Sequence, residues 1–230
     1  LTGTIQTCIT GASNILFTGD GRYNTILKVG ANLDANMFGF LTKTGWQIRD
    51  LTIDGNKANN ADGGIDGNQG GIYATASDYF NIEDVEVKNV EREGIYLSNS
   101  GNSLLENAIV HDCDHNGIIA DMLGTTDIVS CQSYSNGVSG LDISTDPILP
   151  FRNHVIGGIY RNNVQFGVRV SKARHVDLLG VTAEVNGNNG ASPLDGFCIL
   201  DSDDISLIGC DSRENYRAGI IADGCTRIKI

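Results

Sequence analysis

The sequence is poor in several features that mark common classes of protein. It has only three prolines in 230 residues, and its six cysteines never fall at a CxxC spacing. Without that spacing we expect no zinc site, and we expect the cysteines to be small buried thiols rather than disulfides. No apolar run approaches the roughly 18 residues that a membrane-spanning helix needs, so we expect no membrane partner.

Two neighbouring stretches each lack charged residues of one sign: the first lacks basic residues and the second lacks acidic residues. Residues 93–151 contain no lysine or arginine but eight acids, whereas residues 152–175 contain five lysines and arginines and no acid. The net charge of −12 disfavours nucleic acid and anionic membranes as partners. The opposite signs suit coils that handle a polyanion and a cation side by side, or solvated faces that simply differ in charge.

A glycine followed by an apolar residue recurs at nearly constant intervals along the chain. The first four of these glycines are evenly spaced, the next two intervals are a little longer, and the last interval returns to the original spacing. A period in the low twenties with short β-rich segments is typical of a solenoid. The repeat glycines are Gly71, Gly94, Gly117, Gly140, Gly167, Gly196 and Gly219.

Each repeat contains a first strand, a polar turn and a second strand that the glycine leads. A repeat this short has no room for a helix, so the chain must return in parallel, and such crossovers are right-handed. The sequence predicts an all-β, right-handed parallel β-helix of about 23 residues per coil. We expect residues 1–230 to form one such domain, and the mid-pattern start and end indicate a piece of a longer protein. The expected first strands are 82–87, 104–110, 128–133, 155–160, 176–183 and 205–211.

The polar turns are expected to stack on one another. Neighbouring coils lie about 4.8 Å apart, which lets Asn and Asp side chains hydrogen-bond along the axis. The residues expected in this ladder are Asn89, Asp112, Asn136, Asn162, Asn188 and Asn215.

Side chains alternate along a strand, so the residue after each repeat glycine points inward and the next points outward. The outward residues then form lanes that run from coil to coil. The first outward lane is Tyr73, Tyr96, Ile119, Asp142, Arg169, Cys198 and Ile221, and the second outward lane is Thr75, Ser98, Asp121, Ser144, Ser171, Leu200 and Asp223.

Four side chains that fall within three coils of each other form a candidate catalytic cluster: Tyr96, Asp121, Asp142 and Arg169. Arginine suits the neutralisation of a substrate carboxylate, and Tyr96 or Asp121 suits proton transfer. The alternative is that outward residues are polar only because they face water. The flanking residues expected to bind substrate are Tyr73, Ser98, Glu93, His115, Ser144 and Lys172, of which His115 is also a candidate base.

The two aspartates of this cluster allow another chemistry. Asp121 and Asp142 lie one coil and two residues apart, on the order of 8 Å, a separation that suits an inverting glycoside hydrolase. The acids between residues 112 and 142 also suit Ca²⁺, although no loop has EF-hand spacing. We expect no other metal or cofactor.

Five segments of the chain resemble the catalytic module of the secreted mannuronan C5-epimerases, within the pectate-lyase-like superfamily of right-handed β-helices. They are "GDGRYNTILKV", "LTIDGNKANNADGGIDG", "VEVKNVEREGIYLS", "NAIVHDCDHNGIIADM" and "GGIYRNNVQFGVRVSKARHV". The second is the most specific of the five. The resemblance implies a right-handed β-helix that binds a polymer along its exposed sheet.

The catalytic residues of that family are matched at one position. Its Tyr-Gly-Phe-Asp-Pro-His motif places Tyr, Asp and His on Glu93, Tyr96 and Ser98 of this chain, and its loop lysine falls on Gly64. The aspartate of its Val-Ala-Asp segment matches Asp121. Epimerisation therefore does not follow from the resemblance alone.

The leading hypothesis is an enzyme that binds an acidic polysaccharide in a groove and abstracts the proton α to a uronate carboxylate. Epimerases and polysaccharide lyases share that step. One alternative is a non-catalytic glycan-binding or structural module, such as an inactive epimerase-like repeat or a phage tail-spike segment; another is an inverting hydrolase. We expect an extracellular, cell-surface or virion-associated location, while the oligomeric state stays open.

Overall fold

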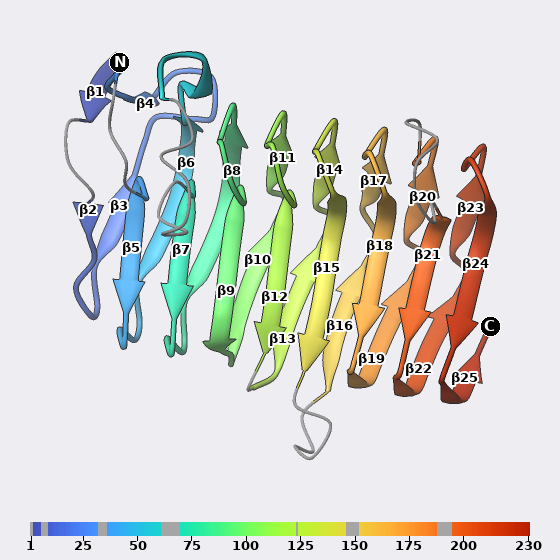
Figure 1. The fold of residues 1–230 in the computed structure, drawn as a ribbon. Coiled ribbons are helices and arrows are strands. Elements are labelled where there is room, and N and C mark those ends of the chain that lie inside the picture. The colour runs from blue at the N-terminus through green and yellow to red at the C-terminus, as the bar shows by residue number, and fades with distance from the viewer. Residues whose placement is uncertain are drawn as a thin grey trace.

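The chain winds into a solenoid of stacked coils, and every strand pairs in parallel with its neighbours (Figure 1). This computed structural model describes residues 2–5, 9–31, 36–60, 70–122, 124–145, 152–187 and 195–230. In those ranges one short 3-10 helix, η1 (Lys57–Asn59), interrupts the strands. The same ranges hold no helix with the length and hydrophobicity needed to cross a membrane.

One wall of the solenoid is a nine-stranded sheet, which faces the viewer in Figure 1. It consists of the strands that the repeat glycines lead, preceded by two strands from the N-terminal coils. In spatial order the described strands are β2 (Ile9–Thr10), β5 (Phe38–Leu41), β7 (Ile72–Thr75), β9 (Ile95–Ser100), β12 (Ile118–Met122), β15 (Ser139–Thr145), β18 (Phe166–Ser171), β21 (Asp195–Leu200) and β24 (Ala218–Asp223).

The other two walls are the two arms of a sheet that has 16 strands among the described residues. Strands β6 (Gln47–Asp54) and β8 (Asn81–Lys88) run through both arms and join them. The first arm adds β3 (Leu16–Thr18), β10 (Ser103–Glu106), β13 (Thr126–Val129), β16 (Asn153–Ile156), β19 (Arg174–Leu179), β22 (Asp203–Ile208) and β25 (Thr226–Lys229). The second arm adds β1 (Thr2–Ile5), β4 (Ile26–Val29), β11 (Ile109–His111), β14 (Gln132–Tyr134), β17 (Ile159–Arg161), β20 (Thr182–Glu184) and β23 (Asp211–Arg213).

The predicted first strands are wrong in one respect, because most of them are two strands joined by a bend. In each case a residue with left-handed backbone turns the chain from the first arm to the second, such as Asn107 at φ 52° and Gly180 at φ 63°. Asn and Gly adopt this conformation at low cost, so their recurrence one coil apart was an available signal. In β8 the equivalent residue, Asp84 at φ 51°, bends the strand without interrupting it.

The interior is a continuous apolar column with aromatic rings at its N-terminal end. Phe40 stacks on Trp46 with ring centroids 3.8 Å apart, and Trp46 stacks on Phe80 at 4.5 Å. All three side chains are buried. Burying such a side chain contributes about 1.5–3 kcal/mol, so the stack anchors the first coils.

A ladder of asparagine side chains runs along one inner corner; it confirms the predicted members Asn136 and Asn215 but not the others. Asn136, Asn163, Asn186 and Asn215 form it, with amide-to-amide distances of 3.0, 3.1 and 3.0 Å. Each Oδ1 also accepts a backbone N–H from the preceding coil; for Asn163 this bond is 3.2 Å long. The ladder satisfies buried backbone donors that the corner would otherwise leave unpaired.

Three predicted ladder residues have another role. Asn89, Asp112 and Asn162 have left-handed backbone and turn the chain just before the ladder position. Asn188 lies outside the described residues. The residue that turns the chain and the residue that joins the ladder are consecutive in the sequence. A repeat pattern alone therefore does not show which of the two joins the ladder.

Replacing Asn163 by alanine is expected to lower the free energy of unfolding by about 2 kcal/mol, because two buried groups of Asn136 lose their acceptor. Chemical denaturation of the variant measures this loss. Asn215→Ala is the matched control and is expected to cost less, because Asn215 is partly exposed and water can take the place of its amide beside Asn186. Equal losses in the two variants would contradict the ladder argument.

The five cysteines that the structure describes are unpaired thiols, as predicted; three of them are buried, whereas Cys210 and Cys225 are partly exposed. Cys131 and Cys210 occupy equivalent places on their coils, with Sγ atoms 3.6 Å from Leu105 O and 3.3 Å from Leu178 O. Burial raises the pKa of Cys131 to about 12. Such a thiol is inert near neutral pH. Cys8 lies outside the described residues.

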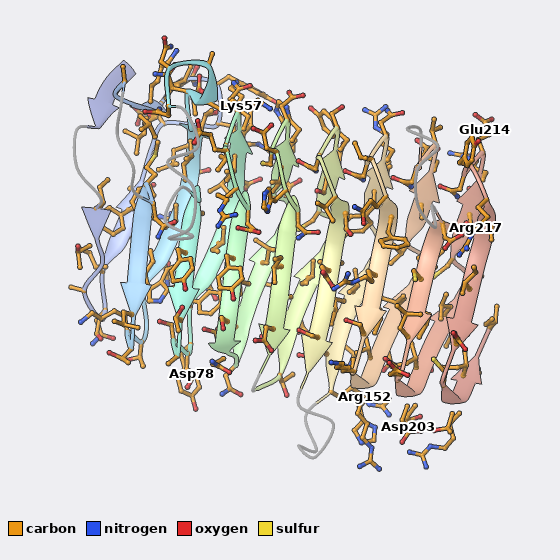
Figure 2. The ribbon with its side chains drawn as sticks, viewed as in Figure 1. Lys57, Asp78, Arg152, Asp203, Glu214 and Arg217 are labelled. Atoms are coloured by element: carbon orange, nitrogen blue, oxygen red, sulfur yellow. The ribbon has the colours of Figure 1, made fainter. Side chains whose placement is uncertain are left out.

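Three cations of the basic stretch, Arg152, Arg169 and Arg174, are paired with acids on other coils. Arg152 lies 3.0 Å from Asp177 and 3.6 Å from Asp204, at the lower edge of the molecule in Figure 2. His154 lies 2.7 Å from Asp127 of the preceding coil. Basic and acidic side chains on different coils therefore form ion pairs with one another. Sequence reasoning did not predict these pairs.

Glu86 on the second arm is a buried carboxylate with several partners. Thr52 Oγ1 and Lys88 Nζ lie 2.9 and 3.0 Å from its Oε2, and His111 Nε2 lies 3.2 Å from its Oε1. Burial alone would raise the pKa of Glu86, but the hydrogen bonds from Lys88, His111 and Thr52 outweigh it and hold the pKa below its usual range. The ionised form is therefore favoured in the folded state.

The Glu86→Gln variant is expected to lose less stability in acid than the wild type. Because folding lowers this pKa, the stability that Glu86 contributes is present above the pKa of the unfolded chain and is lost as the pH falls through the folded value. Unfolding free energies measured between pH 7 and pH 3 check this. The same acid slope in both proteins would show that Glu86 contributes nothing to it.

Candidate functional site

Strand pairing confirms the register of both predicted outward lanes of the nine-stranded sheet, although Cys198 in the first outward lane is buried. Strand pairing aligns Tyr73 with Tyr96, Tyr96 with Ile119, and Asp142 with Arg169. The second outward lane has the same register, with Asp121 between Ser98 and Ser144. The repeat interval therefore places the candidate residues on one wall of the solenoid.

The first outward lane contains a stacked aromatic pair. The rings of Tyr73 and Tyr96 lie 4.9 Å apart at an angle of 13°, and both side chains are partly exposed. Burial raises the pKa of Tyr96, and the nearby Tyr73, Asp121 and Glu93 add to the rise, against a hydrogen bond with Ser98. Tyr96 therefore stays protonated at neutral pH and is suited to donate a proton.

Two polar pairs flank this stack. Ser98 Oγ donates to Asp121 Oδ2 at 3.4 Å in the second outward lane. Glu93 Oε1 lies 3.4 Å from His115 Nδ1, where the chain enters β9 and β12. A carboxylate beside one imidazole nitrogen orients the ring and leaves Nε2 to act on another molecule. We call Tyr73, Tyr96, Ser98, Asp121, Glu93 and His115 the Tyr96 cluster.

Arg169 and Asp142 form a closed ion pair further along the lane. Arg169 Nε donates to Asp142 Oδ1 at 3.1 Å, and its Nη2 lies 3.0 Å from Oδ2. Burial raises the pKa of Asp142 and outweighs the opposing effect of the Arg169 guanidinium. Two donors of the arginine are thus committed to the protein, and its remaining N–H groups are those that a ligand can use.

The structure divides the predicted catalytic residues into two groups. Ile119 separates Tyr96 from Asp142 in the first outward lane, so their backbones stand two strand spacings apart, about 9.6 Å. In the second outward lane Ser144 follows Asp121 and lies beside the ion pair. Lys172 follows β18 in an exposed turn and is the most peripheral of the predicted substrate-binding residues.

Sequence reasoning missed one feature at each end of this wall: two N-terminal strands and an arginine–aspartate pair. Strands β2 and β5 extend the first outward lane to Thr10 and Gly39, although the N-terminal residues have no regular repeat. At the other end Arg217 holds the buried Asp195 through contacts of 2.7 and 2.9 Å. Arg217 lies on the last coil in Figure 2. The first extension was concealed because the interval between Gly39 and Tyr73 is much longer than the regular repeat.

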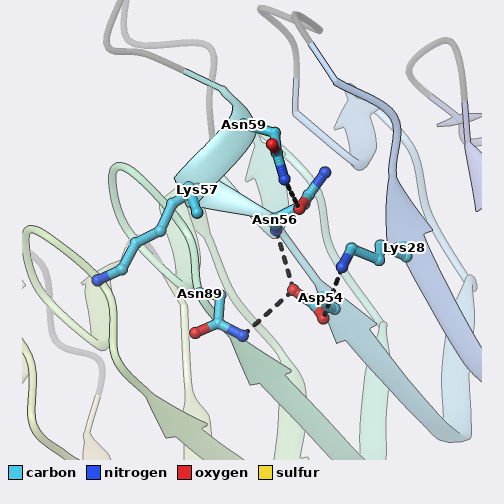
Figure 3. A pocket seen from close by; sticks show the side chains of 7 residues that line it. Lys28, Asp54, Asn56, Lys57, Asn59 and Asn89 are labelled. Atoms are coloured by element: carbon cyan, nitrogen blue, oxygen red, sulfur yellow. Dashed lines mark hydrogen bonds and ion pairs between the residues drawn. The ribbon is translucent and has the colours of Figure 1, made fainter.

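Residues 56–59, which follow β6, line a polar pocket of about 300 Å³ on the second arm (Figure 3). Asp54 accepts from Asn56 N at 2.9 Å and from Asn89 Nδ2 at 3.2 Å, and it lies 4.0 Å from Lys28 Nζ. These polar groups satisfy one another, and the pocket lies outside the nine-stranded sheet, although its Lys57 contacts Asp114, next to His115, at 2.8 Å. Gly64, the position of the family's loop lysine, is outside the described residues.

The residues that the structure describes include no group of three or more His, Cys, Asp or Glu side chains arranged to hold a metal ion. Asp121 and Asp142 lie in different lanes, and Asp142 is engaged by Arg169. Calcium at this wall stays a prediction from the sequence.

Comparisons with known proteins agree with this architecture. The family model described as the right-handed β-helix region matches residues 38–196, which confirms the predicted sense of winding. No curated protein matches the sequence.

Several solved structures share the fold at low sequence identity. The A-module of mannuronan C-5 epimerase AlgE4 from Azotobacter vinelandii superposes with a TM-score of 0.63 and 16% identity, covering 100% of this chain and 87% of the module. The ORF18 protein of Geobacillus virus E2 gives 0.65 and 15%, covering 99% of this chain and 50% of that one. A pectate lyase, Pel9A, gives 0.54 and 18%, covering 89% and 51%. At such identities the likeness shows the fold alone.

Proposed function

Because the chain belongs to the right-handed β-helix family, we propose that its nine-stranded sheet binds an acidic polysaccharide and that the Tyr96 cluster modifies it. The observation that carries the proposal is the partly exposed stack of Tyr73 and Tyr96, bordered by a histidine–carboxylate pair and a serine–carboxylate pair. Aromatic faces bind the apolar faces of sugar rings, and such a site needs a few polar groups to orient them. The similar structures include a mannuronan epimerase and a pectate lyase, which act on uronans.

The proposed reaction begins with abstraction of the proton α to a uronate carboxylate. His115, oriented by Glu93, is the base, and Tyr96, whose pKa burial raises, is the acid that donates a proton. Return of a proton to the opposite face gives the epimer, whereas loss of the 4-O-linked sugar gives an unsaturated product. Asp121 holds Ser98, which in turn hydrogen-bonds the Tyr96 hydroxyl.

Arg169 has a narrower role in this proposal than the sequence suggested. Its pairing with Asp142 makes the two side chains together neutral, so it contributes hydrogen bonds to a substrate carboxylate rather than a free positive charge. It also lies three coils beyond Tyr96, and we assign it to a neighbouring sugar unit.

An inverting hydrolase is the second candidate, because burial raises the pKa of Asp142 as a general acid requires. Asp121 would be the base in that reaction. Against it, both oxygens of Asp142 face donors of Arg169, so the carboxyl group is engaged within the protein rather than directed at a glycosidic oxygen. We therefore favour chemistry at the Tyr96 cluster.

Product analysis on mannuronan, pectate and a neutral glucan tests the proposal. Ultraviolet absorbance reports an unsaturated product, proton NMR reports a changed uronate ratio, and a reducing-end assay reports hydrolysis. Either of the first two supports the proposal, and new reducing ends alone would favour the hydrolase. Binding without product would identify a non-catalytic glycan-binding module. We place the protein outside the cell or on a virion, where such polymers occur.

A further inference from the structure

Among the residues that the structure describes, the first outward lane has one glycine, Gly39, which places no side chain in the lane. Strand pairing aligns Thr10 of β2 with Gly39 of β5, and Gly39 with Tyr73 of β7. Thr10 is exposed, and Tyr73 uses one ring face to stack on Tyr96. The opposite ring face is therefore turned toward the place that Gly39 leaves empty.

A hollow of about 390 Å³ occupies this place, with Thr10, Gly39, Leu41, Lys43 and Tyr73 in its lining. Its size falls within the range of small-molecule sites, roughly 300–1,000 Å³. It lies on the same sheet as the Tyr96 cluster and continues the first outward lane toward the N-terminal coils. A polymer on that lane would reach it next.

The spacing of the strands matches the thickness of one sugar ring. Thr10 and Tyr73 stand two strand spacings apart, about 9.6 Å. A flat ring in contact with an aromatic face lies about 4.5–5 Å from it, which leaves a similar distance to Thr10. One ring therefore fits in line with the two tyrosines. The weakly positive C–H groups of a pyranose suit the negative face of the Tyr73 ring.

Two side chains that line the hollow, Leu41 and Lys43, favour a sugar with both an apolar face and a negative charge. Leu41 is 62% exposed and offers apolar surface beside the Tyr73 ring. The ammonium of Lys43 forms no ion pair within the part of the chain that the structure describes. Near Tyr96, by contrast, the carboxylates of Glu93 and Asp121 disfavour the carboxylate of a sugar, so Lys43 is the cation beside the hollow with which that carboxylate can pair.

We propose that this hollow is a subsite for one hexuronate ring, which stacks on Tyr73 in the place beside Gly39 and pairs its carboxylate with Lys43. The subsite rests on the proposed function, because it extends the same polysaccharide groove by one sugar unit. It gives the groove an acidic-sugar preference at a position where the protein supplies both an aromatic face and a free cation.

Substitution Gly39→Phe tests the subsite, since it fills the empty place in the lane. Gly39 does not have the left-handed backbone that would strain a side chain, and aromatic residues suit strands. In calorimetric titration with a tetramannuronate, the variant is expected to bind at least tenfold more weakly than the wild type. The matched control is Ile221→Phe, seven strands along the same lane and roughly 34 Å away, which is expected to bind as the wild type does.

Substitution Lys43→Gln tests the charge preference at a surface position and keeps the experiment decisive if Gly39→Phe fails to fold. It is expected to weaken tetramannuronate binding about fivefold and to leave a neutral tetraglucoside unaffected. Unchanged tetramannuronate affinity in Lys43→Gln, or in a folded Gly39→Phe, would overturn the subsite. The proposed function would stand in that case if Tyr96→Ala still weakened binding. A wild-type protein that binds neither probe would overturn both.

Discussion

Replacing Tyr96 by phenylalanine is expected to lower turnover of the uronan by about 10²–10⁴-fold, the usual contribution of a positioned acid or base. The ring that stacks on Tyr73 is kept, so affinity for the polymer is expected to change little. Only the hydroxyl is lost. Because burial raises the pKa of Tyr96, this hydroxyl is protonated near neutral pH and is the group that would donate the proton. Initial rates of product formation and calorimetric affinities, measured on the same preparation, separate the two effects.

Tyr73→Phe is the matched control for this experiment. It removes the same atom from the neighbouring ring, one strand away, and is expected to leave turnover within about a factor of three. If Tyr96→Phe kept full activity, the acid would have to be another residue. If both variants lost activity equally, the hydroxyls would act in binding or packing rather than in proton transfer.

Replacing Arg169 by methionine is expected to lower the free energy of unfolding by about 3 kcal/mol, near the lower end for a broken buried pair. The reason is Asp142, which is buried and would lose both of its N–H donors. Methionine keeps most of the apolar stem of the arginine, so the loss reports charge more than packing. Denaturant unfolding of the two proteins measures it.

The variant's deficit is expected to shrink as the pH is lowered. Without Arg169 the pKa of Asp142 rises further above that of the unfolded chain, so the native state takes up a proton more readily and stability falls with rising pH. Asp142→Asn is the control, because the partly exposed Arg169 that it leaves behind is hydrated. A loss in Asp142→Asn as large as that in Arg169→Met would contradict this asymmetry.

The position of the candidate residues could be predicted because the solenoid converts sequence intervals into spatial contacts. A residue and its counterpart one repeat later become strand partners, as Tyr73 and Tyr96 do, and as Ser98 and Asp121 do in the neighbouring lane. Alternation along each strand then decides which side chains face water. This rule worked even across an insertion, since Asp142 and Arg169 still pair although the interval between them is longer than the regular repeat.

The rule failed where two adjacent residues share a polar character but differ in backbone conformation. Asn162 turns the chain with left-handed backbone, and the next residue, Asn163, points inward and joins the buried amide ladder. Both are asparagines, so composition cannot tell them apart. The difference comes from the corner geometry of the whole coil, which the neighbouring coils impose.

The amino-acid sequence by itself determined the winding and the wall on which the candidate site lies, because both follow from a regular interval and a two-residue alternation. Only the tertiary structure decided which of those side chains are available for chemistry. Arg169 is engaged by Asp142, His115 is oriented by Glu93, and the place beside Gly39 stays open, all through contacts between coils. Charge pairing and unfilled space depend on side-chain positions in three dimensions, and an interval along the chain does not contain them.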